Sequence, residues 1–343
     1  MLCTALGRKH TILPKVIQLM KPELYVGLLA ICLPAVRPIP ALSQAPVEES
    51  HSQPQMVSQE AAERVAVAET ATLDPRDRRK LEARLLLGAV LRDRAKFNES
   101  ETVYKGALAD CREFFGVNSP QTAAVENDLA VLLQTRRRYS EAERLLNHSR
   151  SVFERRSGTE TVEFAVILNN LGSLLLSEGK YEEAESVLYR GLQVIEKFQA
   201  REALELADIL NNLGTVKQQT GRYVEADQFY ERAIEILELT VRTDDPKLAV
   251  FLENRAIALS TLGRYEQAEV LFRRSLDSFE TSFGVDSLRL VFVLHQYAVL
   301  LRKVKRQKEA KQFEQRVAII KAADREQREL SLRVDVNSLR LTK

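Results

Sequence analysis

The feature that most constrains this chain is a 42-residue repeat that runs without an insertion or a deletion. A small residue recurs at this spacing in six units, and Leu precedes it in the first four: Gly88, Ala130, Gly172, Gly214, Ala256 and Ala298. Twelve residues further on stands a second small residue: Ser100, Ala142, Ala184, Ala226, Ala268 and Ala310. Self-similarity at such a spacing is typical of stacked-repeat proteins, whose units cannot bury their apolar faces alone. We therefore expect a chain built to hold partners rather than to perform chemistry.

One unit, residues 168–192, shows how a repeat is built. Leucines recur there at the helical spacing i, i+3, i+4, which predicts a helix with one apolar face: Leu168, Leu171, Leu174 and Leu175. Gly179 is expected to end that helix, because glycine adopts the left-handed conformation at little cost. Tyr181 begins a second helix, whose inner stripe is Ala184, Val187, Leu188 and Gly191. Gly172 and Ala184 are small so that the two helices can approach closely, and Tyr181 fills the wedge beside them. The unit is thus predicted to be a helix–turn–helix hairpin.

These hairpins resemble the tetratricopeptide repeat, which has Leu-Gly, Tyr, Ala and an apolar pair at the same spacing. The resemblance covers residues 80–323. The repeat length and the segments Asn-Asn-Leu-Gly, Gly-Lys-Tyr-Glu-Glu-Ala-Glu and Asp-Asp-Pro are similar to the longer repeats of kinesin light chains. The resemblance implies an all-α fold, a right-handed α-solenoid of about six helix–turn–helix repeats. It carries over no motor-binding or cargo-binding residue, because many unrelated proteins share this repeat.

The N-terminal segment has the order of a secretory signal peptide. Basic residues up to Lys21 precede an apolar run from Leu24 to Leu33, and prolines and a small-residue pattern ending at Ser43 follow. We expect cleavage near Ser43 and Gln44, and a protein that is exported to the periplasm or the cell exterior. The apolar run is too short to span a bilayer stably. An uncleaved membrane tether or an organelle-targeting sequence is the alternative.

The sequence predicts four parts in all. The signal peptide covers residues 1–43, and a disordered linker with a short helix over 59–70 covers residues 44–74. Six repeats cover residues 75–323, opened by Asp74 as helix cap and Pro75 as first helical residue. Gln307 and Glu314 replace the usual residues of the last repeat, which suits a polar cap. The fourth part, residues 324–343, is the end of a charged helix and a tail, and the alternation over residues 330–337 predicts a short strand or, preferably, an extended tail.

Charge and cysteine content exclude several classes of function. The chain has a formal net charge of +2, and the part after residue 43 has one of −2. That part lacks the excess of cations that non-specific nucleic-acid binding needs. Cys111 is its only cysteine, and no Cys or His spacing is typical of a zinc site. We expect a partly buried thiol, with a redox or metal role as the lesser alternative, and no cofactor.

Catalytic motifs are absent from the sequence. The four histidines are scattered: His10, His51, His148 and His295. We expect no acid or nucleophile near His148, and the chain has no zinc-protease motif, phosphate-binding glycine loop or nucleophile elbow. The basic runs 136–138 and 302–306 lie at or near predicted hairpin turns, where cations suit helix ends. A site for an acidic partner is the alternative reading of these runs.

The resemblance implies that the first helix of each hairpin lines a concave groove. Two columns of mostly amide residues would then point into it: Asp128, Asn170, Asn212, Asn254 and Gln296, beside Asn127, Asn169, Asn211, Glu253 and His295. Because an amide offers both donor and acceptor, such a column could bind the backbone of an extended peptide. Alternatively, each Asn bonds the adjacent repeat and only fixes stacking. Val166, Ile257 and Phe292 would add apolar contacts.

The sequence therefore predicts a non-enzymatic scaffold that binds an extended protein segment in its groove. The clamp with which this family binds two carboxylates needs Lys and Arg at set positions in the groove. At those positions this chain has Asp208, Thr215 and Val250 instead. The first alternative is a structural or assembly protein that acts through its end faces or convex surface. The second is an accessory subunit of an enzyme. The partner is expected to be a protein or peptide, with membrane contact only through an uncleaved N-terminal segment.

Overall fold

The structure is a computed structural model of the 343-residue chain. It describes residues 61, 64–65, 67–68, 71, 77–157, 159–198 and 203–340, with backbone alone over Gln327 to Arg340. The signal peptide and the linker predicted over residues 1–58 lie outside the described residues, as do Asp74 and Pro75. Within the predicted short helix 59–70, the described residues 61, 64–65 and 67–68 are helical.

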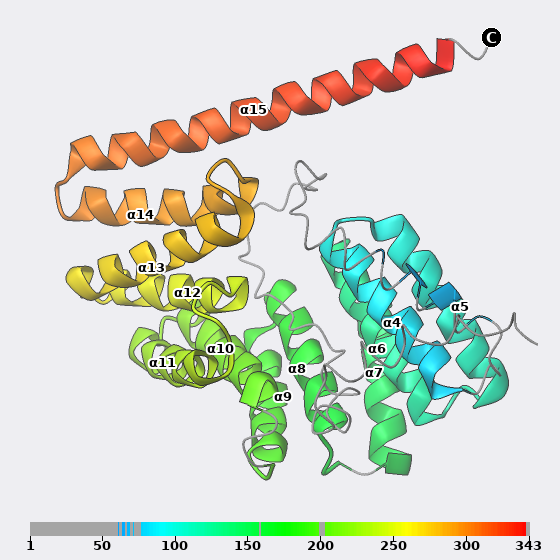
Figure 1. The fold of residues 1–343 in the computed structure, drawn as a ribbon. Coiled ribbons are helices and arrows are strands. Elements are labelled where there is room, and N and C mark those ends of the chain that lie inside the picture. Colours follow the sequence, from blue (N-terminus) through cyan, green and yellow to red (C-terminus); the bar gives the residue numbers. More distant parts are fainter. Residues whose placement is uncertain are drawn as a thin grey trace, which may run out of the picture.

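Twelve α-helices in the described part pair into six antiparallel hairpins that stack side by side (Figure 1). The hairpins are α4 Arg78–Asp93 with α5 Phe97–Phe114, α6 Pro120–Thr135 with α7 Tyr139–Val152, α8 Val162–Ser177 with α9 Tyr181–Ile195, α10 Ala203–Gln219 with α11 Tyr223–Thr240, α12 Pro246–Thr261 with α13 Tyr265–Phe283, and α14 Val291–Lys303 with α15 Gln307–Arg340. A π-helical turn, η2 Phe153–Ser157, follows α7, and a 3₁₀ turn, η4 Leu288–Leu290, precedes α14. The predicted all-α solenoid of six hairpins is confirmed.

Local sequence signals explain where several first helices begin. The side chains of Ser119 and Thr161 accept hydrogen bonds from the backbone N–H groups of the third residues of α6 and α8. Asp245 likewise caps α12, and Pro246 occupies its first position. At α4 the capping side chain is Asp77, which accepts from the Arg79 N–H. The first helix therefore begins three residues later than predicted, because Asp77 supplies the cap that the sequence assigned to Asp74.

Each hairpin turn has one residue in the left-handed conformation. Gly179 has φ +77°, as predicted, and the equivalent Gly221 and Gly263 both have φ +78°. The other three repeats place Ala95, Arg137 and Lys305 there, with φ of 59°, 59° and 63°. The residue after each of these six donates its N–H to a carbonyl five positions back, such as Lys180 N to Leu175 O at 2.9 Å. The turn geometry is thus kept whether or not glycine is present.

The two helices of a hairpin approach closely at the small-residue column. A Cβ added to Gly172 would lie 2.5 Å from Leu188 Cγ, and one added to Gly214 would lie 2.7 Å from the Tyr230 ring. The prediction that glycine permits close approach is confirmed. Tyr104, Tyr230 and Phe272, on the second helices, are buried in this space. Two large apolar clusters share Val250 and Leu271 at their boundary, so the core is continuous along the stack.

The last helix differs most from expectation. Helix α15 has 34 residues, against 13 to 19 for the other eleven helices, and its C-terminal half continues past α14 (Figure 1). The extended tail or strand predicted over 330–337 is wrong, since α15 continues to Arg340. No glycine or proline follows Gln307, so nothing in the sequence ends the helix earlier. No helix among the described residues is long and apolar enough to cross a membrane.

Candidate functional site

The predicted amide columns lie on the first helices of successive hairpins, and the structure joins them to one another. Asn170 Nδ2 on α8 donates to Asn127 Oδ1 on α6 at 2.9 Å. Asn212 Nδ2 on α10 donates to Asn169 Oδ1 at 2.8 Å, and Asn254 Nδ2 on α12 donates to Asn211 Oδ1 at 3.1 Å. We call these three bonds the amide ladder. It is the stacking arrangement that the sequence left as an alternative to peptide binding.

The amide ladder uses only part of the hydrogen-bonding capacity of its members. Each bond takes one N–H of one amide and one lone pair of the next, whereas an amide has two of each. All members except the half-buried Asn254 are buried. Asn212 Oδ1 has no hydrogen-bond partner in the described part of the chain. The ladder therefore fixes the stacking of four repeats and still leaves acceptor capacity along the first helices.

The predicted column ends in an acid at the N-terminal side. Asp128 on α6 is buried and accepts a long hydrogen bond, 3.4 Å, from Asn127 Nδ2. Burial raises the pKa of the Asp128 carboxyl to about 7, against the opposing influence of Arg92 and of that bond. Each ladder bond reaches the residue 43 positions earlier, and for Asp128 that residue is Leu85, whose side chain accepts no hydrogen bond, so the ladder does not continue into the first repeat.

At the C-terminal side the ladder stops at Glu253. This residue occupies the column of Asn127, Asn169 and Asn211, but it carries a carboxyl in place of their amide. Glu253 is buried, and burial raises the pKa of its carboxyl group to about 8. Its Oε1 atom has no hydrogen-bond partner in the part of the chain that the structure describes. Gln296 on α14 is half-buried and His295 exposed. Of the seven predicted site residues, the ladder unites five, and Asp128 and Gln296 flank it.

A second set of contacts, which was not predicted from the sequence, joins the hairpin turns of neighbouring repeats. The residue just before each second helix is basic, and from the second repeat on it reaches an acid in the preceding repeat, as Arg138 does with Glu101 at 2.8 Å and Arg306 with Glu269 at 2.7 Å. We call the full set the turn ladder: Arg138–Glu101, Lys180–Glu143, Arg222–Glu185, Arg264–Asp227 and Arg306–Glu269. Its acids and bases each recur every 42 residues, which is the signal that could have revealed it.

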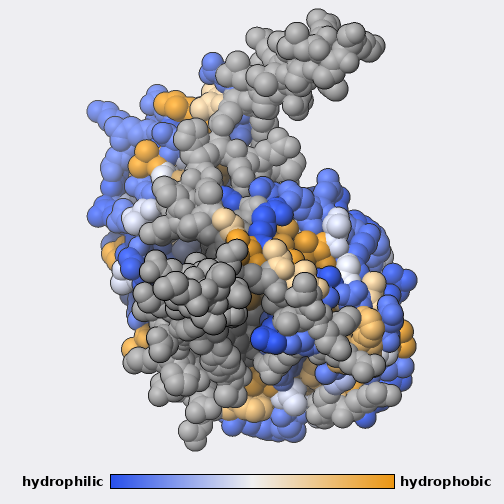
Figure 2. Space-filling model, turned by 45° about the vertical axis from the view of Figure 1, so that its right-hand side comes forward, coloured by the Kyte–Doolittle hydropathy of each residue, from blue (hydrophilic) through white to orange (hydrophobic). Residues whose placement is uncertain are grey.

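A third set, the outer ladder, links the second helices. Glu154 pairs with Arg190 at 2.8 Å, and the same pair recurs at Glu196–Arg232, Glu238–Arg274 and Glu280–Arg316. Exposed pairs of this kind contribute little stability, about 0 to 1 kcal/mol each. Their value lies in fixing the register between repeats, so that the first helices keep one relative arrangement. On the coloured part of the surface in Figure 2, hydrophobic residues lie in small groups among hydrophilic ones.

The structure also places the residues singled out as catalytic or redox candidates. His148 Nδ1 contacts Glu126, so the expectation that no acid lies near this histidine is wrong. The reason is that α7 packs against α6, which carries Glu126. The Cys111 thiol is buried, and burial raises its pKa to about 11, so it is a poor nucleophile at neutral pH. No group of three potential metal ligands is found among the described residues.

Comparison with known structures places the fold in a recognised class. The chain is similar to BtubC (BKLC) from P. vanneervenii, with 21% identity and a TM-score of 0.53 over 68% of this chain and 94% of that one. It is similar to a Rap protein complexed with competence and sporulation factor, with 14% identity and a TM-score of 0.52 over 81% and 89%. Repeats of a putative kinesin light chain from Podosopora anserina match with 16% identity and a TM-score of 0.47 over 62% and 99%.

Sequence comparison identifies the family. No curated protein sequence matches the chain significantly. The tetratricopeptide repeat profile matches residues 81–155, 163–238 and 247–318, each of which spans two hairpins of the structure. These matches cover more than half of the chain, and the chain therefore belongs to the tetratricopeptide repeat family.

Proposed function

We propose that this protein is a non-enzymatic scaffold that binds an extended segment of another protein along its first helices. The observation that carries the proposal is the stack of six hairpins, whose first helices the amide ladder holds side by side. Half-buried side chains of these helices outside the ladder, among them Ile257, Phe292 and Gln296, would contact the bound segment.

The three ladders support this function through pre-organisation. A groove that already has its bound shape avoids much of the entropy cost of ordering on binding. The amide ladder fixes neighbouring first helices, while the turn ladder and the outer ladder fix the second helices. The bound segment would then bear most of the ordering cost. A Rap protein of similar fold has been solved with competence and sporulation factor bound, which is consistent with a ligand-binding solenoid.

One observation favours a second candidate, a structural or assembly role. Helix α15 is about twice as long as the other helices, and its backbone continues beyond the hairpin it belongs to (Figure 1). A projecting helix at the end of a solenoid is a surface on which another subunit could pack. Mass measured by light scattering over a range of protein concentrations distinguishes this role, because self-association raises the mass and binding of a peptide does not.

Peptide selection tests the groove proposal directly. A displayed library of short random peptides is selected on the wild-type chain, and the affinity of the best peptide is measured by fluorescence anisotropy. Ile257→Ala and Phe292→Ala should each weaken it, since both half-buried side chains lie on first helices outside the amide ladder. Val270→Ala, at an exposed residue of α13, is the matched control. The proposal is refuted if the control weakens binding as much as the two groove variants do.

A further inference from the structure

The outer ladder is interrupted between the first two second helices. The first pair of the outer ladder is Glu154 with Arg190. The residues 42 positions before them are Arg112 on α5 and His148 on α7. Both side chains turn to Glu126 on α6, Arg112 through a 2.8 Å ion pair and His148 through its Nδ1 atom. No ion pair of the described residues therefore bridges α5 and α7 at this level, as it does between the later second helices.

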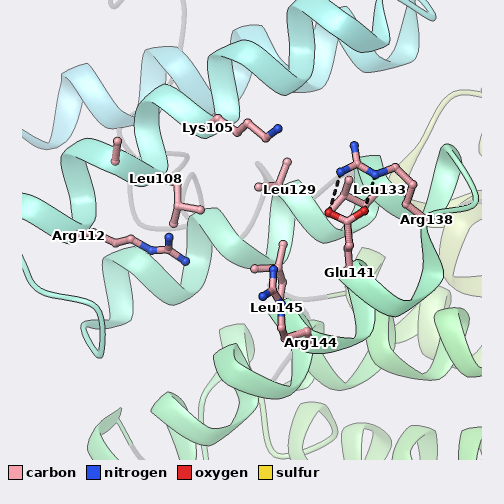
Figure 3. Close-up of a pocket in the computed structure, with 10 residues that line it drawn as sticks. Lys105, Leu108, Arg112, Leu129, Leu133, Arg138, Glu141, Arg144 and Leu145 are labelled. Atoms are coloured by element: carbon pink, nitrogen blue, oxygen red, sulfur yellow. Dashed lines mark hydrogen bonds and ion pairs between the residues drawn. The ribbon is translucent and has the colours of Figure 1, made fainter.

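A pocket of 320 Å³ lies at this interruption (Figure 3). Its floor is apolar and is made by four leucines of α5, α6 and α7: Leu108, Leu129, Leu133 and Leu145. Its rim carries four cations and one acid: Lys105, Arg112, Arg138, Arg144 and Glu141. In Figure 3 the side chains of Lys105 and Arg112 come from α5, while Arg138, Glu141 and Arg144 come from the α7 side.

The charge that the pocket presents to a partner is positive, because two nearby acids are buried. The side chain of Glu126 is 2% exposed, whereas that of its partner Arg112 is 46% exposed. The side chain of Glu101 is 10% exposed and is shared by Lys105, Arg136 and Arg138. One carboxylate thus faces three cations. Arg144 is exposed, and its side chain takes part in no hydrogen bond or ion pair within the described part. Among the residues that line the pocket, Glu141 alone is acidic, and it pairs with Arg138.

We propose that this pocket is a second docking surface, on the outer side of the solenoid, for an acidic protein segment that carries a large apolar side chain. The apolar side chain packs on the leucine floor, and carboxylates on either side of it pair with Lys105, Arg112 and Arg144. Arginine favours such contacts because its guanidinium binds a carboxylate with two parallel hydrogen bonds. A leucine floor offers nothing to a phosphate backbone, so a protein segment fits this surface better than a nucleic acid does. The proposal is independent of the groove proposed above.

The test uses two matched pools of fluorescein-labelled peptides on the full chain. In one pool, Leu or Phe at the centre is flanked by Asp and Glu at random positions, and in the other by Asn and Gln. The acidic pool should bind more tightly than the amide pool. Arg144→Glu should weaken binding of the acidic pool about fivefold or more, because it replaces an attraction at the rim with a repulsion. Since the Arg144 side chain makes no hydrogen bond or ion pair, this variant should fold as the wild type does, which circular dichroism checks.

Lys308→Glu, at an exposed lysine of α15, is the charge-matched control and should leave the affinity unchanged. Equal binding of the two pools would overturn the proposal, and so would an equal loss in Arg144→Glu and Lys308→Glu. A short DNA duplex is tested as a competitor. If it displaces the acidic pool and itself binds more weakly to Arg144→Glu, the pocket is a site for polyanions, and the assignment to a protein segment is overturned.

Discussion

Replacing Glu253 with Gln should make the protein more stable at neutral pH. The Glu253 carboxyl is buried and its Oε1 atom has no partner in the described part, and burial raises its pKa from the ordinary 4.5 to about 8. The folded state therefore keeps a proton that the unfolded state releases, so stability falls as the pH rises through the window from 4.5 to 8. At pH 7 the loss is of the order of 3 kcal/mol, from about 1.4 kcal/mol per pH unit above the unfolded pKa. Gln keeps the shape and avoids the ionisation.

Urea unfolding at several pH values measures this difference. The free energy of unfolding of Glu253→Gln should exceed that of the wild type by about 2–3 kcal/mol at pH 7, and the gap should nearly close by pH 5. Glu266→Gln, at an exposed glutamate of α13 in the same repeat, is the matched control and should change nothing. A stability gap that stays constant across the pH range would refute the reasoning, because it could not come from ionisation of Glu253.

Three further predictions concern packing, the amide ladder and export. Gly214→Ala should destabilise the protein by about 1–3 kcal/mol in urea unfolding, since the new Cβ would lie 2.7 Å from the Tyr230 ring, and adding Tyr230→Leu should recover part of the loss. Asn169→Ala and Asn212→Ala should each cost about 1–3 kcal/mol, and the double variant should cost less than their sum, as a double-mutant cycle would measure. Intact mass spectrometry of protein from the native cell should give a chain that begins near Gln44, and a mass that includes residues 1–43 would contradict export with cleavage.

The repeat pattern was sufficient to predict the fold, because each hairpin is specified by signals within one unit. The second helices begin at the predicted column, from Phe97 to Gln307, and Gly179 has the predicted positive φ. The length of α15 could not be obtained in the same way. The alternation over residues 330–337 is compatible with a strand, but a strand needs a neighbour to pair with, and none of the described segments is a strand.

The sequence predicted which residues form the candidate site, but it did not predict which groups their side chains contact. The sequence places Asn170 and Asn212 in one column, and whether their amides face a ligand or another repeat depends on how the repeats stack. In the structure the bonds join residues 43 apart, one position off the repeat length, so the amides of two adjacent columns meet. The turn ladder could have been predicted, because Glu185 and Arg222 belong to columns of constant charge. The pocket at Arg112 is recognisable only once the outer ladder that it interrupts is known.

The central claim, that a partner segment lies along the first helices, is tested most directly by site-specific photo-crosslinking in extract of the native cell. A photo-reactive amino acid replaces Gln296 on α14, which is half-buried and outside the amide ladder, or Val270 on α13, which is 57% exposed. Equal expression and equal thermal stability of the two variants make their crosslinks comparable. A partner protein captured from position 296 and not from position 270 is the predicted result. A partner captured from position 270 alone would contradict the account and place binding on the outer surface.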